Sequence, residues 1–166
     1  MKTLGIDYGV RKLSVAALTF TGVGAVPEVF SFFWDKKTSR DYIVYDACEK
    51  LQEHHLRHLW EDVDLVNIEY PFFINSRQTA IRMSMMAGAL MVQARKLTNN
   101  TAQVRFVEPA KWKREVVGYA RADKAQTMEY LNAEWPDFTF HNDDEADALC
   151  LALHGYLENE PTSGKS

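Results

Sequence analysis

Four acidic residues stand at positions where a carboxylate is unexpected or lies close to another one. Asp7 interrupts the apolar segment Leu-Gly-Ile-Asp-Tyr, and Glu69 ends the apolar run Val-Asp-Leu-Val-Asn-Ile-Glu. Aspartate is depleted in strands, and a buried carboxylate must be paired or must coordinate a metal ion. Asp144 and Asp147 are spaced i and i+3, so on a helix their carboxylates share one face. The chain therefore holds a set of acids that are expected to need a positive charge or a metal ion as a partner.

Divalent cations are the partners that suit such a set of acids. Mg²⁺ and Mn²⁺ prefer carboxylate and water ligands, and the apolar strands hold no obvious counter-charge. Two such ions, about 3.5 to 4 Å apart, can stabilise the attacking water and the leaving oxygen in phosphodiester hydrolysis. Taken singly, Asp7 could cap the turn that follows it, Glu69 could form a salt bridge at a strand end, and the helix pair could be an ordinary acidic first turn. Their conjunction favours a metal-dependent site.

The net charge of −4 conceals an uneven distribution of charge along the chain. Residues 77–124 contain ten Lys or Arg and three acids, a local charge of +7, which leaves −11 for the rest. Electrostatic fields act through local patches, so a basic middle segment could attract nucleic acid in spite of the acidic total. The same residues could equally be solvated faces of helices.

The spacing of apolar residues predicts the elements that carry these acids. Three strands separated by glycine-containing turns come first, as an antiparallel meander, and helices then alternate with further strands. This order predicts an α/β fold with a mixed five-stranded sheet flanked by helices, in one domain at 1–158 followed by a disordered tail at 159–166. The predicted strands are 3–8, 14–20, 26–34, 63–70 and 103–107, and the predicted helices are 39–60 (with Ser39 as candidate N-cap), 78–97, 109–117, 123–135 and 143–157.

The composition argues against several other classes of protein. With 46% apolar and 25% charged residues the chain sits at the globular average. No apolar run approaches the ~18 to 20 residues that span a bilayer, and the N-terminus lacks the pattern of a signal peptide. Cys48 and Cys150 are far apart and form no CxxC pair, which is typical of small apolar residues in a reducing compartment. We therefore expect a soluble, cytoplasmic protein with no membrane partner.

Four segments, taken together, carry a resemblance to a known family. They are GIDYGVRKLSVAAL, NIEYPFFINSRQTAIRMSMMAGAL, PAKWKREVVGYARADKAQ and DDEADALCLALHG. In this order and spacing they resemble the RuvC family of Holliday junction resolvases, within the RNase H-like nuclease superfamily, from Lys2 to about Tyr156. The resemblance implies an RNase H-like fold, cleavage of four-way DNA junctions with two Mg²⁺ or Mn²⁺ ions, and a bacterial cell as the setting. The short, divergent chain would also suit a phage-encoded member.

The resemblance also implies roles for individual residues. The four acids match the metal-binding catalytic tetrad of the family, and Lys113 and Lys124 match lysines near the scissile phosphate. Phe72, next to Phe73, matches an aromatic side chain placed near the junction core, although either ring could instead be a core residue. The helix at 78–97 matches the one through which the family forms homodimers. The residues expected to contact branched DNA are Phe72, Phe73, Arg77, Arg82, Lys111, Lys113, Arg114 and Lys124.

Two other functions remain open at this point. A nuclease of the same superfamily that processes structured RNA, like the YqgF proteins, also opens with a strand resembling LGIDYG. A non-catalytic module that recognises branched DNA by its shape is the second alternative. The segment PAKWKREVVG and the helix DEADALCLALHG favour the resolvase over the RNA nuclease, and the presence of all four acids disfavours the non-catalytic module.

Overall fold

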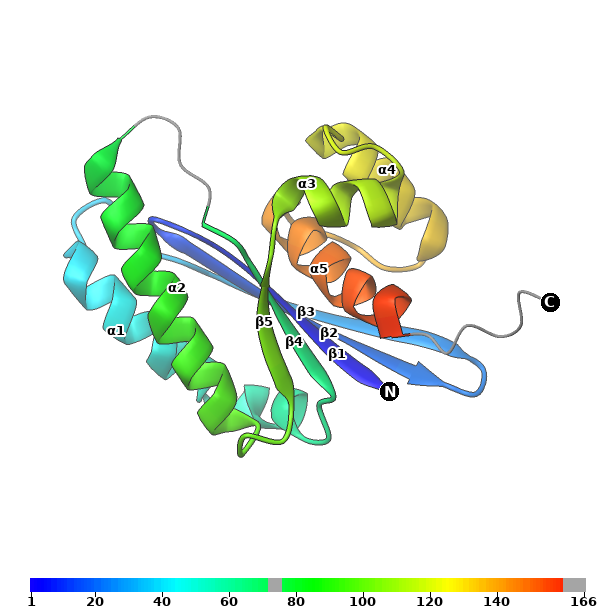
Figure 1. Ribbon diagram of the computed structural model, residues 1–166, viewed down its shortest axis with the longest axis horizontal. Helices are drawn as coiled ribbons and strands as arrows, with labels where there is room; N and C mark the ends of the chain where they lie inside the picture. Colours follow the sequence, from blue (N-terminus) through cyan, green and yellow to red (C-terminus); the bar gives the residue numbers. More distant parts are fainter. Residues whose placement is uncertain (72–75, 160–166) are drawn as a thin grey trace.

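The first three strands follow one another as an antiparallel meander, and two later strands extend the sheet in parallel with the first. The computed structural model describes residues 1–71 and 76–159. Strand β1 lies at the centre of the order β3-β2-β1-β4-β5, with β2 antiparallel and β4 parallel to it (Figure 1). The predicted mixed five-stranded sheet is therefore confirmed. The strands are β1 (Lys2–Gly9), β2 (Lys12–Thr21), β3 (Gly24–Phe33), β4 (Leu65–Glu69) and β5 (Gln103–Val107).

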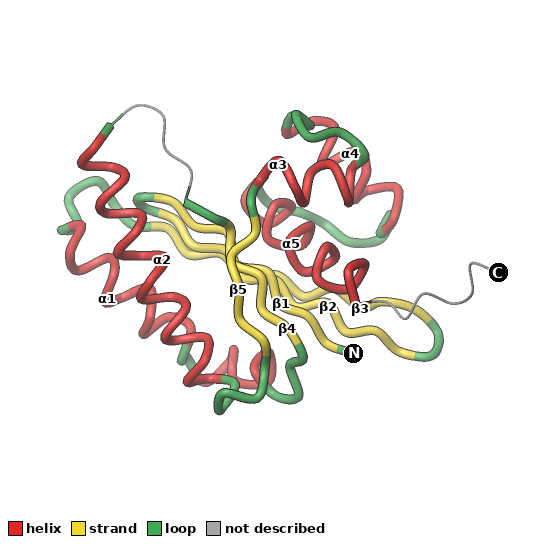
Figure 2. Tube along the Cα trace, viewed as in Figure 1, coloured by secondary structure: helices red, strands yellow, loops and turns green. Residues whose placement is uncertain are grey.

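Helices cover both faces of the sheet, as Figure 2 shows. Helices α1 and α2 pack on one face, where they share an apolar core with the sheet. The other face is covered by α5 and by the shorter helices between β5 and α5. The helices are α1 (Arg40–Leu51), the 3₁₀ segment η1 (His54–Trp60), α2 (Arg77–Leu97), α3 (Pro109–Trp112), the π-helical turn η2 (Lys113–Val117), α4 (Lys124–Glu134) and α5 (Asp143–Asn159).

Two of the predicted helices differ from the observed ones. The single helix predicted over 39–60 is wrong, because α1 ends at Leu51 and η1 begins at His54. Within the described chain, Ser39 occupies the N-cap position but makes no capping hydrogen bond through its side chain. The helix predicted over 109–117 is continuous, but it widens into a π turn from Lys113 and ends at Gly118 in the left-handed conformation.

Alternation along β1 divides its side chains between the two cores. Leu4 and Ile6 join the core beneath α1 and α2, while Thr3 and Gly5 face α5. Since successive side chains of a strand point to opposite faces, Asp7 shares the α5 face with Thr3 and Gly5. The strand therefore delivers its one carboxylate to the side of the sheet that α5 covers.

Helix α5 approaches the sheet so closely that backbone meets backbone. A Cβ atom built on Gly5 would lie 1.9 Å from the carbonyl oxygen of Ala148, and one built on Gly155 would lie 2.8 Å from the Leu65 side chain. Thr3 Oγ1 also donates a hydrogen bond of 2.8 Å to the carbonyl of Ala152. These contacts fix the position of α5 on β1 and β4. They thereby also fix where the acids in its first turns lie along these strands.

In the part of the chain that the structure describes, no helix combines the length and apolar character needed to cross a bilayer. Cys48 and Cys150 are free thiols, the second of them buried.

Candidate active site

Asp7 is a buried carboxylate with an unsatisfied oxygen. Its residue is only 4% exposed, and among the described residues its Oδ2 atom has no hydrogen-bond partner. The ammonium of Lys12 lies 3.5 Å from that oxygen. Burial and the charge of Glu69 raise the pKa of Asp7 well above its usual range, and Lys12 opposes the rise. A group this costly to bury is expected to have a functional reason for its place.

Glu69 reaches the same edge of the sheet as Asp7 because β4 runs parallel to β1. Ile6 pairs with Ile68, so the residues that follow them, Asp7 near the end of β1 and Glu69 at the end of β4, lie side by side. Trp112 Nε1 donates a hydrogen bond of 3.2 Å to Glu69 Oε2. Burial nevertheless raises the pKa of Glu69 to about 7, against the opposing effect of that hydrogen bond. This carboxyl is therefore harder to ionise than an ordinary glutamate.

The first turns of α5 add the other two predicted acids to the same place. Burial raises the pKa of Asp147, which the positive charge of Lys113 opposes. Asp144 accepts a hydrogen bond from the ammonium of Lys12. The negative charges of Asp144 and Asp147 also act on the pKa of Asp7. The structure thus brings the four predicted acids into one electrostatically linked group.

Lys12 is a member of this group that sequence reasoning missed. The counter-charge that we did not expect within the two acid-bearing strands comes from the start of the neighbouring strand β2, because Lys12 touches both Asp7 and Asp144. Burial alone would lower the pKa of Lys12, but Asp7 and Asp144 raise it overall. The hairpin register gives the signal: Gly9 pairs with Lys12 and Asp7 with Ser14, so Lys12 lies diagonally across from Asp7 on the same face.

The two predicted catalytic lysines lie at different distances from the acids. Lys113 Nζ donates to the carbonyl of Ala122 at 2.9 Å and sits 5.4 Å from the centre of the Trp112 ring. Its charge also opposes the pKa rise of Asp147, which places Lys113 within the field of the acids. Lys124 is exposed and forms its ion pair with Asp143, at 2.8 Å, rather than with a tetrad acid.

The other predicted DNA contacts in the segment 111–114 point in different directions. Lys111 forms an ion pair with Glu158, near the end of α5 that is remote from the acids. Arg114 is exposed and lies 3.5 Å from Glu115. Neither side chain lies at the tetrad, so their predicted contacts with DNA stay predictions.

The remaining residues predicted to contact DNA lie on α2 or in the segment before it. Arg77 is exposed at the first residue of α2. Arg82 lies one turn further along, beside Gly9 at the hairpin that carries Lys12. Phe72 and Phe73 lie outside the described residues.

A second polar group, which sequence reasoning also missed, lies deeper under α5. Among the described residues, three candidate metal-ligating atoms within 4.8 Å of one another occur at Glu115, His154 and Glu158. His154 is 0% exposed, and its Nε2 atom lies 2.8 Å from Glu115 Oε2. Burial lowers the pKa of His154, so the neutral ring donates from Nε2. Glu158 is already paired with Arg105 and Lys111, which favours a structural network over a metal site here.

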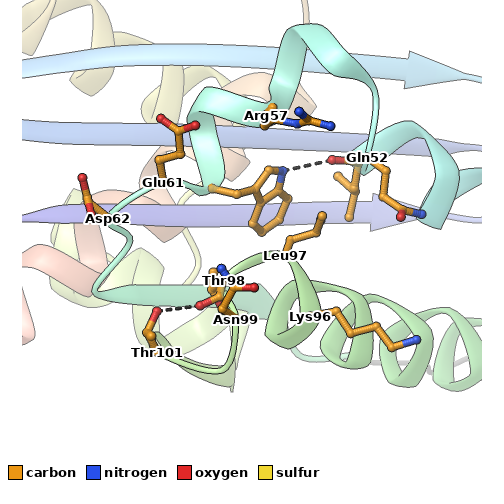
Figure 3. A pocket seen from close by; sticks show the side chains of 11 residues that line it. Gln52, Arg57, Glu61, Asp62, Lys96, Leu97, Thr98, Asn99 and Thr101 are labelled. Atoms are coloured by element: carbon orange, nitrogen blue, oxygen red, sulfur yellow. Dashed lines mark hydrogen bonds between the residues drawn. The ribbon is translucent and has the colours of Figure 1, made fainter.

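A wide cleft in the described part of the chain lies away from the tetrad (Figure 3). It has a volume of about 740 Å³ and is lined by the residues that precede β4 and β5, at the opposite ends of these strands from Glu69. Its lining holds two basic side chains, Arg57 and Lys96, and two acidic ones, Glu61 and Asp62, so their formal charges cancel. Because of its position and its balanced charge, this cleft is not a better candidate for the active site than the acid group.

The fold and the acids together define a class of protein. A mixed sheet in this strand order, flanked by helices on both faces, is the RNase H-like fold. The model of the family "Crossover junction endodeoxyribonuclease RuvC" matches residues 3–154, and the chain belongs to this family. The predicted family and fold are confirmed.

Individual relatives agree with the family model. RuvC of Gloeobacter violaceus is 30% identical over 99% of this chain and 93% of that protein. The structure of Thermus thermophilus RuvC superposes with a TM-score of 0.70 at 22% identity, covering 95% of this chain and 96% of that one. A structure of the Thermus thermophilus protein in complex with Holliday junction substrate superposes with a TM-score of 0.69 at 18% identity, with the same coverage. The two superpositions establish the shared fold.

Proposed function

We propose that this protein resolves four-way DNA junctions by hydrolysing phosphodiester bonds at the acids of β1, β4 and α5. The observation that carries the proposal is the buried Asp7, whose Oδ2 atom has no hydrogen-bond partner among the described residues, in the middle of three further acids. Membership of the RuvC family, with a relative solved on a Holliday junction, supports this substrate over structured RNA.

The donor set fits divalent metal ions of the Mg²⁺ type. Asp7, Glu69, Asp144 and Asp147 would hold them, because hard cations prefer carboxylate oxygens and water. The Oδ2 atom of Asp7, which lacks a hydrogen-bond partner among the described residues although Lys12 lies 3.5 Å away, and the raised pKa of the buried Glu69 support a site that would gain from further positive charge. When bound, two Mg²⁺ or Mn²⁺ ions supply charge neutralisation at the phosphate and activation of the attacking water.

The protein's own side chains prepare the acids for this task. Trp112 holds one oxygen of Glu69 through its indole N–H and leaves the other oxygen for a ligand. Lys12 compensates Asp7 and Asp144 and keeps their carboxylates near each other. Lys113, fixed by the carbonyl of Ala122, supplies positive charge beside Glu69 and Asp147, where a phosphate would gain negative charge during cleavage.

A homodimer through α2 is the second part of the proposal. Ile81, Met85 and Val92 are large apolar side chains that α2 leaves exposed. Their spacing places them near one face of the helix, where a second copy could cover them. A two-fold dimer would carry two active sites, as paired nicks across a junction require. Sedimentation of the wild type and of Met85→Arg tests this, and a wild-type monomer at assay concentration would refute it.

A cleavage assay on a synthetic four-way junction with Mg²⁺ tests the activity. The wild type should make paired, symmetric nicks, and Asp7→Asn should bind the junction without cutting it. A linear duplex of the same sequence is the substrate control. Faster cleavage of structured RNA would favour the RNA nuclease, and binding without cleavage by the wild type in either Mg²⁺ or Mn²⁺ would favour a non-catalytic module.

A further inference from the structure

A small pocket lies next to the acids, between the end of β4 and the start of α3. It has a volume of about 410 Å³. Its walls are mostly apolar, with one acidic and one basic side chain among them. The lining residues are Tyr70, Glu108, Pro109, Ala110, Lys113 and Ala120.

The pocket shares Lys113 with the acid group, and its Tyr70 wall is the residue after Glu69, directed to the other face of the sheet where it meets Phe106. Tyr70 directly follows Glu69 in the chain, so it leaves the sheet where the acid group is assembled. Lys113 lines the pocket, and its charge lowers the pKa of both Glu69 and Asp147. A phosphate held at the acids would therefore have its neighbouring nucleotide within reach of this pocket.

Tyr70 has the features of a fixed stacking platform. Its residue is 47% exposed, which is unusual for an aromatic side chain next to a buried core strand. Its backbone N–H donates a hydrogen bond of 2.7 Å to the carbonyl of Val107, which continues the pairing of β4 with β5. Its ring stands at 88° to that of Phe106, with the ring centres 6.1 Å apart. The aromatic surface is thus both anchored and accessible.

Glu108 adds a selective group at the same pocket. It is exposed at the N-cap position of α3, and within the described chain its side chain makes no capping hydrogen bond. An acid here would repel the phosphate backbone, so its presence needs another partner. Carboxylates accept hydrogen bonds from exocyclic amino groups of bases, such as N4 of cytosine.

We propose that this pocket receives one unstacked base of the strand being cut, which stacks on Tyr70 and is selected by Glu108. The base belongs to a nucleotide that flanks the scissile phosphate. Bases with an exocyclic amino group are preferred over thymine, which lacks one. The proposal rests on the proposed junction cleavage and adds to it a source of sequence preference that is separate from the metal-binding acids.

The experiment compares junctions that differ at single positions around the nick. Each flanking nucleotide is replaced in turn by an abasic site, and cytosine is exchanged for thymine at the same positions. With wild-type protein, one abasic position should slow cleavage by about tenfold or more, since base–aromatic stacking is strong. Tyr70→Ala should cut the intact and abasic junctions at equal rates, and Tyr70→Phe should retain the discrimination.

Two further variants separate the roles of the pocket residues. Glu108→Gln should keep the discrimination against the abasic site but lose the preference for cytosine over thymine. Tyr45→Ala removes an exposed ring on α1, outside this pocket, and should behave like the wild type. The proposal is overturned if Tyr70→Ala discriminates as the wild type does, or if the wild type tolerates an abasic site at every flanking position. If the wild type cuts no junction, the proposed function itself fails and this inference fails with it.

Discussion

Asn67 of β4 and His154 of α5 meet in a buried contact directly beneath the acids, with Asn67 Nδ2 lying 3.3 Å from His154 Nδ1. Asn67 precedes Glu69 by two residues and so shares its face of the strand, and His154 follows Asp147 by two helical turns. The amide–imidazole pair and the acid pair are therefore successive layers of one strand–helix contact. Glu115, two residues after Lys113, completes the lower layer through His154 Nε2.

This lower layer is expected to hold the acid-bearing elements in place. Replacing His154 by Ala would remove the buried ring, its contact with the Asn67 amide (which also donates to the Leu151 carbonyl) and its hydrogen bond with Glu115, at a cost of about 1 to 3 kcal/mol in unfolding free energy. Urea denaturation measures the loss, and His154→Gln should restore part of it. His141→Ala, at an exposed histidine, is the matched control and should unfold like the wild type. Equal midpoints for His154→Ala and the control would show that the layer is dispensable.

Removing the Asp7 carboxylate should stabilise the metal-free protein while it abolishes cleavage. The pKa of Asp7 is raised in the folded state, so its ionisation above the unfolded pKa costs folding free energy. Asp7→Asn removes this cost, and its urea midpoint in EDTA should exceed that of the wild type at pH 8. The gain should shrink as the pH falls towards the unfolded pKa of Asp. Asp143→Asn, at the neighbouring acid bonded to Lys124, should show no comparable gain.

Metal uptake should release protons near neutral pH. The pKa of Glu69 is raised from 4.5 to about 7, so this carboxyl must lose a proton before it can act as a ligand at pH 6.5. Mg²⁺ affinity should therefore rise with pH up to about pH 8. Titration calorimetry at pH 6.5 in buffers of different ionisation enthalpy should give buffer-dependent heats, and the dependence should be weaker at pH 8.5. Identical heats in all buffers at pH 6.5 would contradict the raised pKa.

In the metal-free protein the same carboxyl should make stability depend on pH. The folded state binds a proton at Glu69 between the unfolded pKa of 4.5 and the folded value of about 7, whereas the unfolded state does not. Stability should then fall as the pH rises through this window, by on the order of 3 kcal/mol for this group alone. Urea denaturation in EDTA from pH 5 to pH 8 measures the trend, and Glu69→Gln should flatten it.

Lys12 should matter most when no metal ion is present. It is the cation that touches both Asp7 and Asp144, so Lys12→Gln leaves the acids to repel one another. We expect this variant to melt below the wild type in EDTA and to be stabilised by Mg²⁺ more strongly than the wild type is. Lys36→Gln, at an exposed lysine, is the control. An equal Mg²⁺-induced shift in all three proteins would argue against this role.

Gly5 should tolerate no side chain. A Cβ atom there would lie 1.9 Å from the Ala148 carbonyl, so Gly5→Ala must push α5 away from β1. The cost should be at least about 1 to 3 kcal/mol, the usual range for overpacking. Cleavage should fall as well, because α5 carries two of the acids. Gly22→Ala, where a Cβ would meet nothing within 4 Å in the described structure, should change neither property.

Local sequence patterns predict much of this fold, because the strands are apolar runs and the acids within them are easy to recognise. The residues 103–107 form a strand as predicted, and Asp7 and Glu69 are conspicuous as charges in apolar runs. The interruption of the helix predicted over 39–60 carries no such signal, since neither Gly nor Pro marks the residues between Leu51 and His54. The role of His154 is hidden for another reason: its buried partners come from β4 and η2, so only the tertiary structure reveals them.

The docking of α5 on β1 also has a consequence for the protein while it is being translated. Thr3 and Ala152, which are 149 residues apart in the chain, are hydrogen-bonded partners in this contact. Long-range pairing of this kind forms late, because a ribosome must first deliver the distant segment. A nascent chain that still lacks α5 carries Asp7 and Glu69 but not Asp144 and Asp147. With these four acids as the proposed catalytic centre, we expect unfinished copies to be unable to cut DNA, because the centre is completed only after α5 has been synthesised.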